Sequence, residues 1–251
     1  MARDNNGIWI EKYRIHSYEV DRSSRALPHV LLCYMLNSAW AHVNDSRFSF
    51  NSLHDDGQFW VLSRFLAVFH QIPRWDDELT IETWGKGIDK LFASRDFVIY
   101  SDAREKLISA TSAWLIIDRK TLRPLRMETL KEQFPFQSER HELENKLEKI
   151  RARSVPGTNT EFKVRYSDLD VNQHVNSSKY MQWILDSFPV EILEGKNIKS
   201  FEINYLAEAQ LDDRISVFIG PDAEQYYCVI TRADDKTELC KAIVTWSGPE
   251  A

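Results

Sequence analysis

Three polar side chains at alternate positions, Asp170, Asn172 and His174, are the residues most able to do chemistry in this chain. They follow a strand-like segment at 161–166 and precede an amphipathic helical pattern. On an extended segment, every second side chain leaves the backbone on the same face. A carboxylate, an amide and an imidazole presented together can carry out acid–base and hydrogen-bonding chemistry on a carbonyl group. The spacing therefore predicts a functional site in front of the helix.

A structural interpretation of the same stretch stays open. Asp and Asn are common in turns and at helix N-caps, and we expect Asn176 to cap the helix that follows. Asp170 could serve purely as a turn residue. Three polar groups at alternate positions, one of them a histidine, favour the functional interpretation.

Composition narrows the class of protein. The 251 residues are 43% hydrophobic, which is enough for one large domain or two small ones. The net charge of -6 argues against a nucleic-acid partner. With no apolar signal core and no membrane-spanning run, we expect a soluble cytoplasmic protein that has no membrane partner. A disulfide framework or a zinc site is not expected from the three widely spaced cysteines, Cys33, Cys228 and Cys240.

The two halves of the chain resemble each other. A turn with two Asp residues followed by an alternating strand occurs twice, with Asp77 and Asp213 136 positions apart. A second similar pair, Trp114 and Trp246, is 132 positions apart. Nearly equal offsets are expected from a duplicated unit, although a chance likeness between strand sequences would give the same short matches.

Hydrophobic periodicity predicts a strand, a helix and further strands in each half. The helix at 27–43 is apolar on most sides, so we expect it to be buried. Helices followed by consecutive antiparallel strands indicate an α+β fold in which a sheet curls around a helix. The expected strands are at 8–16, 58–70, 78–85, 92–101 and 107–117, then, around a second helix at 176–188, at 161–166, 199–207, 213–220, 225–233 and 238–247.

A charged linker is expected between the halves, at 131–160. Leu143, Leu147 and Ile150 form a helical stripe in it, and Glu142 and Lys146 are spaced to support a helix. We therefore expect a surface helix here, between a first domain at 1–130 and a second at 161–251.

The stretch from Asp170 to Asn176 resembles the signature of the acyl-acyl-carrier-protein thioesterases, a family of plant plastid enzymes and bacterial relatives. Pieces at 60–64, 73–77 and 81–84 are also similar to that family, and the likeness extends from about residue 8 to residue 247. The resemblance implies two tandem hot-dog units, each a curved antiparallel sheet wrapped around a central helix. It places the acyl-chain pocket in the first unit and the catalytic residues in the second.

The resemblance also implies a catalytic set. Asp170, Asn172 and His174 match the family directly. The family also has an acidic residue on the strand after the second helix, 34 positions beyond the histidine, and it corresponds to Glu208. Some members carry a cysteine beside that glutamate, but this chain has Ala209, which excludes a cysteine nucleophile there. Taken alone, Glu208 could equally be a surface charge on a strand.

These residues suggest hydrolysis of a thioester by an activated water. Glu208 and His174 would act on the water, one accepting its proton and the other orienting it, while Asn172 holds the water or Glu208. Asp170 would fix the geometry of Asn172 or His174. Backbone N–H groups at the start of the 176–188 helix could bind the oxyanion. In a rival scheme Asp170 or Glu208 attacks directly and forms an anhydride.

Three functions are compatible with these features. The resemblance favours a hydrolase that releases free fatty acid from acyl-acyl carrier protein. Hydrolysis of acyl-coenzyme A, as in hydroxybenzoyl-coenzyme A thioesterases, and non-catalytic acyl binding are the alternatives. We expect no metal, no organic cofactor, and a monomer or a homodimer.

The implied partner is the acidic carrier protein with its acyl-phosphopantetheine arm, so its docking surface should be basic. We expect at least one of two basic clusters to contact it. The acyl chain should lie beside the helix at 31–39 and the residues Trp60, Leu62 and Phe65. The two clusters are Arg119, Lys120, Arg123 and Arg126 with Lys131 nearby, and Lys146, Lys149, Arg151 and Arg153.

Overall fold

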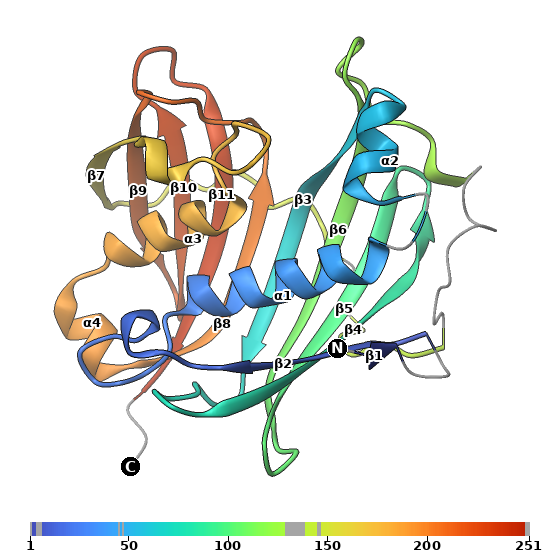
Figure 1. Cartoon of the computed structure of the whole chain (residues 1–251). Coiled ribbons are helices and arrows are strands. Elements are labelled where there is room, and N and C mark those ends of the chain that lie inside the picture. Colours follow the sequence, from blue (N-terminus) through green and yellow to red (C-terminus); the bar gives the residue numbers. More distant parts are fainter. Residues whose placement is uncertain are drawn as a thin grey trace. The chain divides into compact units, whose positions relative to one another are not determined.

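Antiparallel strands with a long helix against them recur in both halves of the chain (Figure 1). The computed structural model describes residues 2–3, 7–44, 46, 48–128, 139–144 and 147–248. These residues divide into a first unit, Met1–Leu147, and a second unit, Glu148–Ala251. In the described part, no helix is both long and apolar enough to cross a membrane.

In the first unit, the strands pair antiparallel in the order β1-β2-β4-β5-β6-β3. Helix α1 crosses in front of these strands and α2 lies beside β3 (Figure 1). The elements are β1 (Ala2–Arg3), β2 (Trp9–Arg14), α1 (Pro28–Val43), α2 (Phe50–Asp55), β3 (Gln58–Phe69), β4 (Glu78–Asp89), β5 (Phe92–Ser101) and β6 (Lys106–Asp118).

In the second unit, the order is β8-β11-β10-β9-β7, again with antiparallel pairing throughout. Helix α3 takes the place that α1 has in the first unit (Figure 1). The elements are β7 (Thr158–Lys163), α3 (Ser177–Asp186), α4 (Val190–Gly195), β8 (Asn197–Tyr205), β9 (Arg214–Asp222), β10 (Gln225–Arg232) and β11 (Glu238–Ser247).

The predicted fold class, α+β with two tandem hot-dog units, is confirmed. Helices α1 and α3 begin within one residue of the predicted helices, and every expected strand from 58–70 onward is present within a few residues of its expected limits. The short helices α2 and α4 were not predicted, because six residues are too few to show a helical period.

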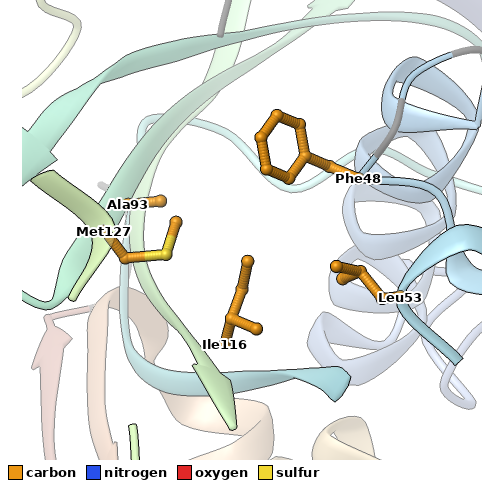
Figure 2. Close-up of a cluster of buried hydrophobic side chains, with 5 residues drawn as sticks. All are labelled: Phe48, Leu53, Ala93, Ile116 and Met127. Carbon is orange, nitrogen blue, oxygen red and sulfur yellow. The ribbon is translucent and has the colours of Figure 1, made fainter. Parts of the chain in front are cut away.

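The apolar residues of the first unit explain this arrangement. Leu31, Leu32 and Met35 of α1 are almost completely buried, as the even distribution of apolar residues around the helix predicted. A separate apolar cluster fills the space under α2 (Figure 2). It comprises Phe48, Leu53, Ala93, Ile116 and Met127, and the half-buried rings of Trp60 and Trp114 pack against it.

Backbone hydrogen bonds show the internal repeat directly. A turn precedes α1 at 19–27 and another precedes α3 at 168–176, and we name them the first turn and the second turn. Asp21 N–H donates to Arg25 O and Asp170 N–H donates to His174 O, each at 2.8 Å. The two pairs are 149 positions apart in sequence, so the two units build the same turn from different residues.

The predicted linker helix is wrong, because the described residues 139–144 and 147–157 contain no helix. Residues 139–144 instead form an irregular strap on the first unit, bound by side chains of β4 and β5. Asp96, which is fully buried, accepts a hydrogen bond from Glu142 N–H at 2.8 Å. Glu82 receives a hydrogen bond from Arg140 at 2.8 Å, and Trp84 Nε1–H donates to Arg140 O at 2.9 Å.

Residues 148–157 belong to the second unit and pack on its strands. Ile150 is buried against Tyr227, Val229 and Ile243, and its N–H donates to Asn204 Oδ1 at 2.7 Å. The apolar stripe of the linker therefore reflects packing on strands rather than one face of a helix. Lys131 and Lys146, which the sequence placed in or near this segment, lie outside the described residues.

The ion pairs of Glu82 give a prediction about stability and pH. Burial opposes ionisation of Glu82, but hydrogen bonds and charges of Arg140 and Arg104 outweigh it and lower the pKa of the carboxyl below its ordinary value. A lowered pKa in the folded state stabilises the fold above the ordinary pKa, and this stabilisation is lost as the pH falls. Glu82→Gln should therefore reduce the free energy of unfolding by about 1–3 kcal/mol at neutral pH, and the loss should shrink below about pH 4.

Urea unfolding of both proteins between pH 7 and pH 3 measures this difference. Glu78→Gln, at an exposed position of the same strand, is the control and should change little at any pH. A loss that is the same at pH 7 and pH 3 would rule out the ionic origin.

Candidate active site

The second turn is a tight reversal of the chain rather than an extended segment. Leu169 and Val175 form an isolated antiparallel bridge, and the residues between them curve around the Asp170 side chain. Asp170 Oδ1 accepts hydrogen bonds from the N–H groups of Asn172 at 2.8 Å and His174 at 3.3 Å. Gln173 completes the turn in the left-handed region, with φ of 66°.

This geometry corrects the expectation that Asp170, Asn172 and His174 project from one face of a strand. A turn with a left-handed residue does not have the period of two on which that expectation depended. Asp170 has a structural role in this turn, because its carboxylate binds the backbone of its own turn. Asp170 therefore acts on Asn172 and His174 through their main-chain N–H groups.

The second turn brings His174 to Glu208. Their side chains meet with His174 Nε2 and Glu208 Oε2 3.3 Å apart, within the reach that acid–base chemistry requires. Both side chains are accessible to solvent, with exposed fractions of 36% and 49%. A water molecule can therefore reach the pair. An imidazole and a carboxylate in contact can share the tasks of orienting a water and accepting its proton.

Glu208 lies in the loop 206–210 that follows β8, so it is not on the strand, where the resemblance placed it. The loop is tied to β10, because Arg232 Nη2 donates to Glu208 O at 2.8 Å. Arg232 does not stand out in the sequence. Its only signal was a basic residue at the end of a strand, which is common on protein surfaces.

Asn172 has a weaker connection to the pair. Its N–H binds Asp170, but its side-chain amide makes no hydrogen bond to any described residue. The amide therefore does not hold Glu208, which was one of its two expected tasks. It remains available to bind a water or a substrate oxygen.

The start of α3 offers few free backbone donors. Asn176 caps the helix as predicted, because its Oδ1 accepts hydrogen bonds from Ser178 N–H at 2.9 Å and from Ser178 Oγ–H at 2.8 Å. Lys179 N–H donates to Asn176 O at 2.9 Å. Of the first three N–H groups of α3, that of Ser177 has no acceptor among the described residues and is available to an oxyanion.

The first turn has the same backbone but different chemistry. By the backbone hydrogen bonds, Arg25 stands where the second turn has His174, and Ile72 stands where the second unit has Glu208. Arg25 is bound within its own turn, with Arg25 Nε and Nη2 each 2.9 Å from Asp21 Oδ2. An arginine and an isoleucine cannot activate water together, so the pair exists in the second unit alone.

The two units also join the turn to its facing loop differently. In the first unit, Ala26 N–H donates to Pro73 O at 2.8 Å and Trp75 N–H donates to Ser24 O at 2.9 Å. In the second unit, the corresponding N–H groups, those of Val175 and Leu211, make neither bond within the described part of the chain. The candidate site therefore lies in the unit whose turn and facing loop lack these two backbone bonds.

The cysteines do not supply a nucleophile to this site. Cys228 and Cys240 lie inside β10 and β11 and are fully buried. Burial raises the pKa of both thiols well above its usual range, so both stay protonated near neutral pH. The side chains at the site leave a water or a carboxylate as the attacking group.

Two family models together match most of the chain. The acyl-ACP thioesterase N-terminal domain matches residues 7–132, and the acyl-ACP thioesterase C-terminal domain matches residues 152–248. The second match contains the second turn and Glu208, and the first contains the first turn.

Curated relatives give the same family. A chloroplastic acyl-[acyl-carrier-protein] hydrolase from Cuphea viscosissima is 30% identical over 93% of this chain. A chloroplastic palmitoyl-acyl carrier protein thioesterase from Arabidopsis thaliana is 28% identical over 96% of this chain. The chain covers 60% and 64% of the lengths of these two proteins.

Solved structures agree with the fold. An acyl-ACP thioesterase from Bacteroides thetaiotaomicron superimposes with a TM-score of 0.88 at 27% identity, covering 98% of this chain and 100% of that one. A 12:0-ACP thioesterase from Umbellularia californica gives a TM-score of 0.81 at 20% identity, covering 96% of this chain and 98% of that one, which supports the fold alone.

The hydrogen bonds of Asp170 lead to a prediction about the second turn. Asp170→Ala removes an acceptor used by two N–H groups and should lower the free energy of unfolding by about 1–3 kcal/mol. Asp170→Asn retains a side-chain oxygen and should lose less. Asn172→Ala, at a side chain with no bond to described residues, is the control and should stay within about 0.5 kcal/mol of the wild type.

Chemical denaturation of these four proteins and of Asp21→Ala at neutral pH makes the comparison. Asp21→Ala in the first turn should resemble Asp170→Ala, with a further loss from the pairing of Asp21 with Arg25. If Asp170→Ala were as stable as the wild type, the carboxylate would not be what holds the second turn.

Proposed function

Since the chain belongs to the acyl-acyl carrier protein (acyl-ACP) thioesterase family, we propose that it hydrolyses acyl-ACP to free fatty acid and carrier thiol. The contact between His174 and Glu208 carries the proposal. Of the two turns, the second turn has both an imidazole, that of His174, and a carboxylate on the facing loop, that of Glu208. The names of the relatives, which include acyl-[acyl-carrier-protein] hydrolases, support the same reaction.

The reaction begins with a water bound against the pair. One member of the pair accepts a proton from the water and the other orients it, while the oxygen attacks the thioester carbonyl carbon. The negative charge that develops on the carbonyl oxygen faces the start of α3, where the N–H of Ser177 can stabilise it. Cleavage of the carbon–sulfur bond then releases a thiolate, which takes up the proton held by the pair.

The hydrogen bonds of Asp170 make it the less suitable nucleophile in the covalent scheme, in which a carboxylate attacks the thioester. Its Oδ1 already accepts two backbone N–H groups, which lowers its nucleophilicity and fixes it in the turn. A direct attack would therefore have to come from Glu208. The contact of Glu208 with His174 suits a base better than an attacking carboxylate, and we assign the attack to water.

The loop at 119–126 is our candidate docking surface for the acidic carrier protein. Arg119, Lys120 and Arg123 are exposed there, and Asp118 is an acidic neighbour of Lys120. The loop is held in shape, because Asp118 Oδ1 accepts hydrogen bonds from Lys120 N–H at 3.1 Å and from Thr121 N–H at 2.7 Å. A fixed basic loop suits an acidic partner.

The second basic cluster is a weaker candidate. Arg153 is bound to Asp222 of β9, which neutralises part of its charge. Lys149 and Arg151 are exposed, and Lys146 lies outside the described residues.

Binding of the acyl chain in the first unit remains a proposal from the sequence. It is supported by the half-buried rings of Trp60 and Trp114, which contact each other edge to face at 6.3 Å between centroids. They lie against the cluster of Figure 2, whose side chains are of the kind that a fatty acyl chain contacts. The expectations of a cytoplasmic location and of a monomer or homodimer rest on the sequence alone.

Removing either member of the pair should abolish most of the activity. His174→Ala and Glu208→Gln should each lower kcat for acyl-ACP about 10²- to 10⁴-fold, because each removes an acid–base group. His141→Ala, at an exposed histidine of the strap, is the control and should keep the wild-type rate.

Steady-state rates on matched acyl-ACP and acyl-coenzyme A substrates provide the measurement. A higher kcat/KM for the coenzyme A thioester would favour the acyl-coenzyme A alternative. No hydrolysis of either substrate by the wild type would indicate an acyl-binding protein and overturn the proposal.

Reversing the charge of the loop should weaken carrier binding. The triple change Arg119→Glu, Lys120→Glu and Arg123→Glu should raise KM for acyl-ACP about tenfold or more, because it places like charges opposite an acidic partner. Hydrolysis of an acyl thioester of a small thiol should be unaffected.

The matched variant carries Lys149→Glu and Arg151→Glu in the second cluster and should keep the wild-type KM. Equal effects of the loop variant on carrier and small-thiol substrates would refute docking at the loop.

A further inference from the structure

The peptide group that follows Glu208 is held at both of its polar atoms. Its carbonyl oxygen accepts a hydrogen bond from Arg232 Nη2 at 2.8 Å. Its N–H, which belongs to Ala209, donates to the Tyr180 hydroxyl at 2.9 Å. Two side chains from different elements, β10 and α3, therefore fix one peptide plane next to Glu208.

Arg232 is itself held in place. Its Nε donates to Asp213 Oδ2 at 2.9 Å and its Nη1 donates to Asp235 Oδ2 at 3.0 Å. Asp213 Oδ2 also accepts a hydrogen bond from Gln210 N–H at 2.9 Å, so it binds the same loop. The planar guanidinium reaches three acceptors in fixed directions, which the single ammonium of a lysine cannot do.

Tyr180 is held by packing. Its side chain is almost completely buried, and its ring meets those of Trp183 and Tyr205 edge to face at 5.6 and 5.5 Å between centroids. Burial raises the pKa of its hydroxyl, so the group stays neutral and accepts the Ala209 N–H without adding a charge.

The Glu208 side chain has little of its own to hold it. It is half-exposed, and His174 is its one polar contact among the described residues. A glutamate that is free to rotate in solvent would spend much of its time away from the imidazole. Fixing the adjoining peptide limits the directions in which the carboxylate can point.

We propose that Tyr180 and Arg232 are positioning residues, which clamp the Glu208–Ala209 peptide and so keep the Glu208 carboxylate against His174. That these two residues affect turnover rests on the proposed hydrolase function. Their effect on the position of Glu208 does not, and it can be tested without measuring activity.

The first unit supplies an internal comparison. Backbone pairing sets Leu31 at the position of Tyr180, Pro73 at that of Ala209 and Ser101 at that of Arg232. Proline has no N–H to donate, and leucine has no hydroxyl to receive one. The clamp and the His174–Glu208 pair are thus present together in one unit and missing together from the other, although both units build the same turn.

Tyr180→Phe tests the clamp by removing one oxygen atom. Tyr227→Phe is the matched control, because Tyr227 is also a buried tyrosine of the second unit, but it packs against Ile150 and not on the Glu208 loop. Both variants should lose similar stability in urea unfolding. Tyr180→Phe alone should lower kcat for acyl-ACP, about 10- to 100-fold, with KM nearly unchanged, because misplacing a reacting group by about 1 Å has effects of that size.

Arg232→Lys is a second variant on the other anchor. It keeps a positive charge beside Asp213 but cannot reach all three acceptors, and we expect the same fall in kcat. Asp234→Asn, at an exposed position that holds neither Arg232 nor the Glu208 loop, is the control and should keep the wild-type kcat.

A measurement at fixed pH separates the clamp from the function. The ring-proton NMR signals of His174, assigned by their loss in His174→Ala, should move in Tyr180→Phe towards their positions in Glu208→Gln. They should stay in place in Tyr227→Phe. If the wild type hydrolyses nothing, this arm still reports on the clamp while the proposed function fails.

Two results would overturn the clamp. One is a Tyr180→Phe protein that loses stability like Tyr227→Phe but keeps its kcat and its His174 signals. The other is a fall in kcat with His174 signals unchanged, which would show that Tyr180 acts by some route other than placing Glu208.

Discussion

The contact between His174 and Glu208 is the interaction on which the functional account of this chain depends. The two residues are 34 positions apart, and they come from a turn before a helix and from a loop after a strand. At 3.3 Å between Nε2 and Oε2, they are close enough to act as the acid–base pair that we propose. The carboxylate of Asp170 shapes the turn from inside, and Arg232 ties the loop to β10. Neither segment would place its residue correctly without these bonds.

The duplicated fold shows which features serve structure and which serve chemistry. Asp21 and Asp170 occupy the same place and bind the same N–H groups of their turns, so this aspartate is needed to build the turn. His174 and Glu208 have no counterparts in the first unit, where backbone hydrogen bonds close the turn against its loop. Giving up that pairing leaves room for two reactive side chains.

Much of this arrangement follows from the sequence. The apolar composition of 27–43 predicted a buried helix, and Leu31 and Met35 are buried as expected. The repeat of Asp77 at Asp213 revealed the duplication. The strap at 139–144 was misread as a helix, because a short apolar stripe fits a helix as well as an extended segment that packs on strands. The buried carboxylate of Asp96 accepts a hydrogen bond from the backbone of this segment, at Glu142. The two residues are far apart in sequence, so the sequence does not reveal the contact.

The sequence predicted which residues form the candidate site better than it predicted how they are arranged. The resemblance named Asp170, Asn172, His174 and Glu208 together, but alternation suggested a strand where the chain turns. Gln173 has a left-handed backbone conformation, which breaks the alternation of side chains between two faces. A glutamine gives no sign of this conformation in the sequence. Arg232 and Tyr180 could not be identified as partners of the loop, because hydrogen bonds to backbone atoms do not depend on a recognisable pair of side chains.

Oxygen isotope labelling tests the central claim most directly, namely that the pair activates a water molecule. The enzyme would turn over acyl-ACP once in water enriched in oxygen-18, and mass spectrometry would then examine the fatty acid and the peptides that contain Glu208 and Asp170. We predict label in the fatty acid and none in either carboxylate. Label in Glu208, with an unlabelled fatty acid, would show that the carboxylate attacks the thioester itself and would contradict the account.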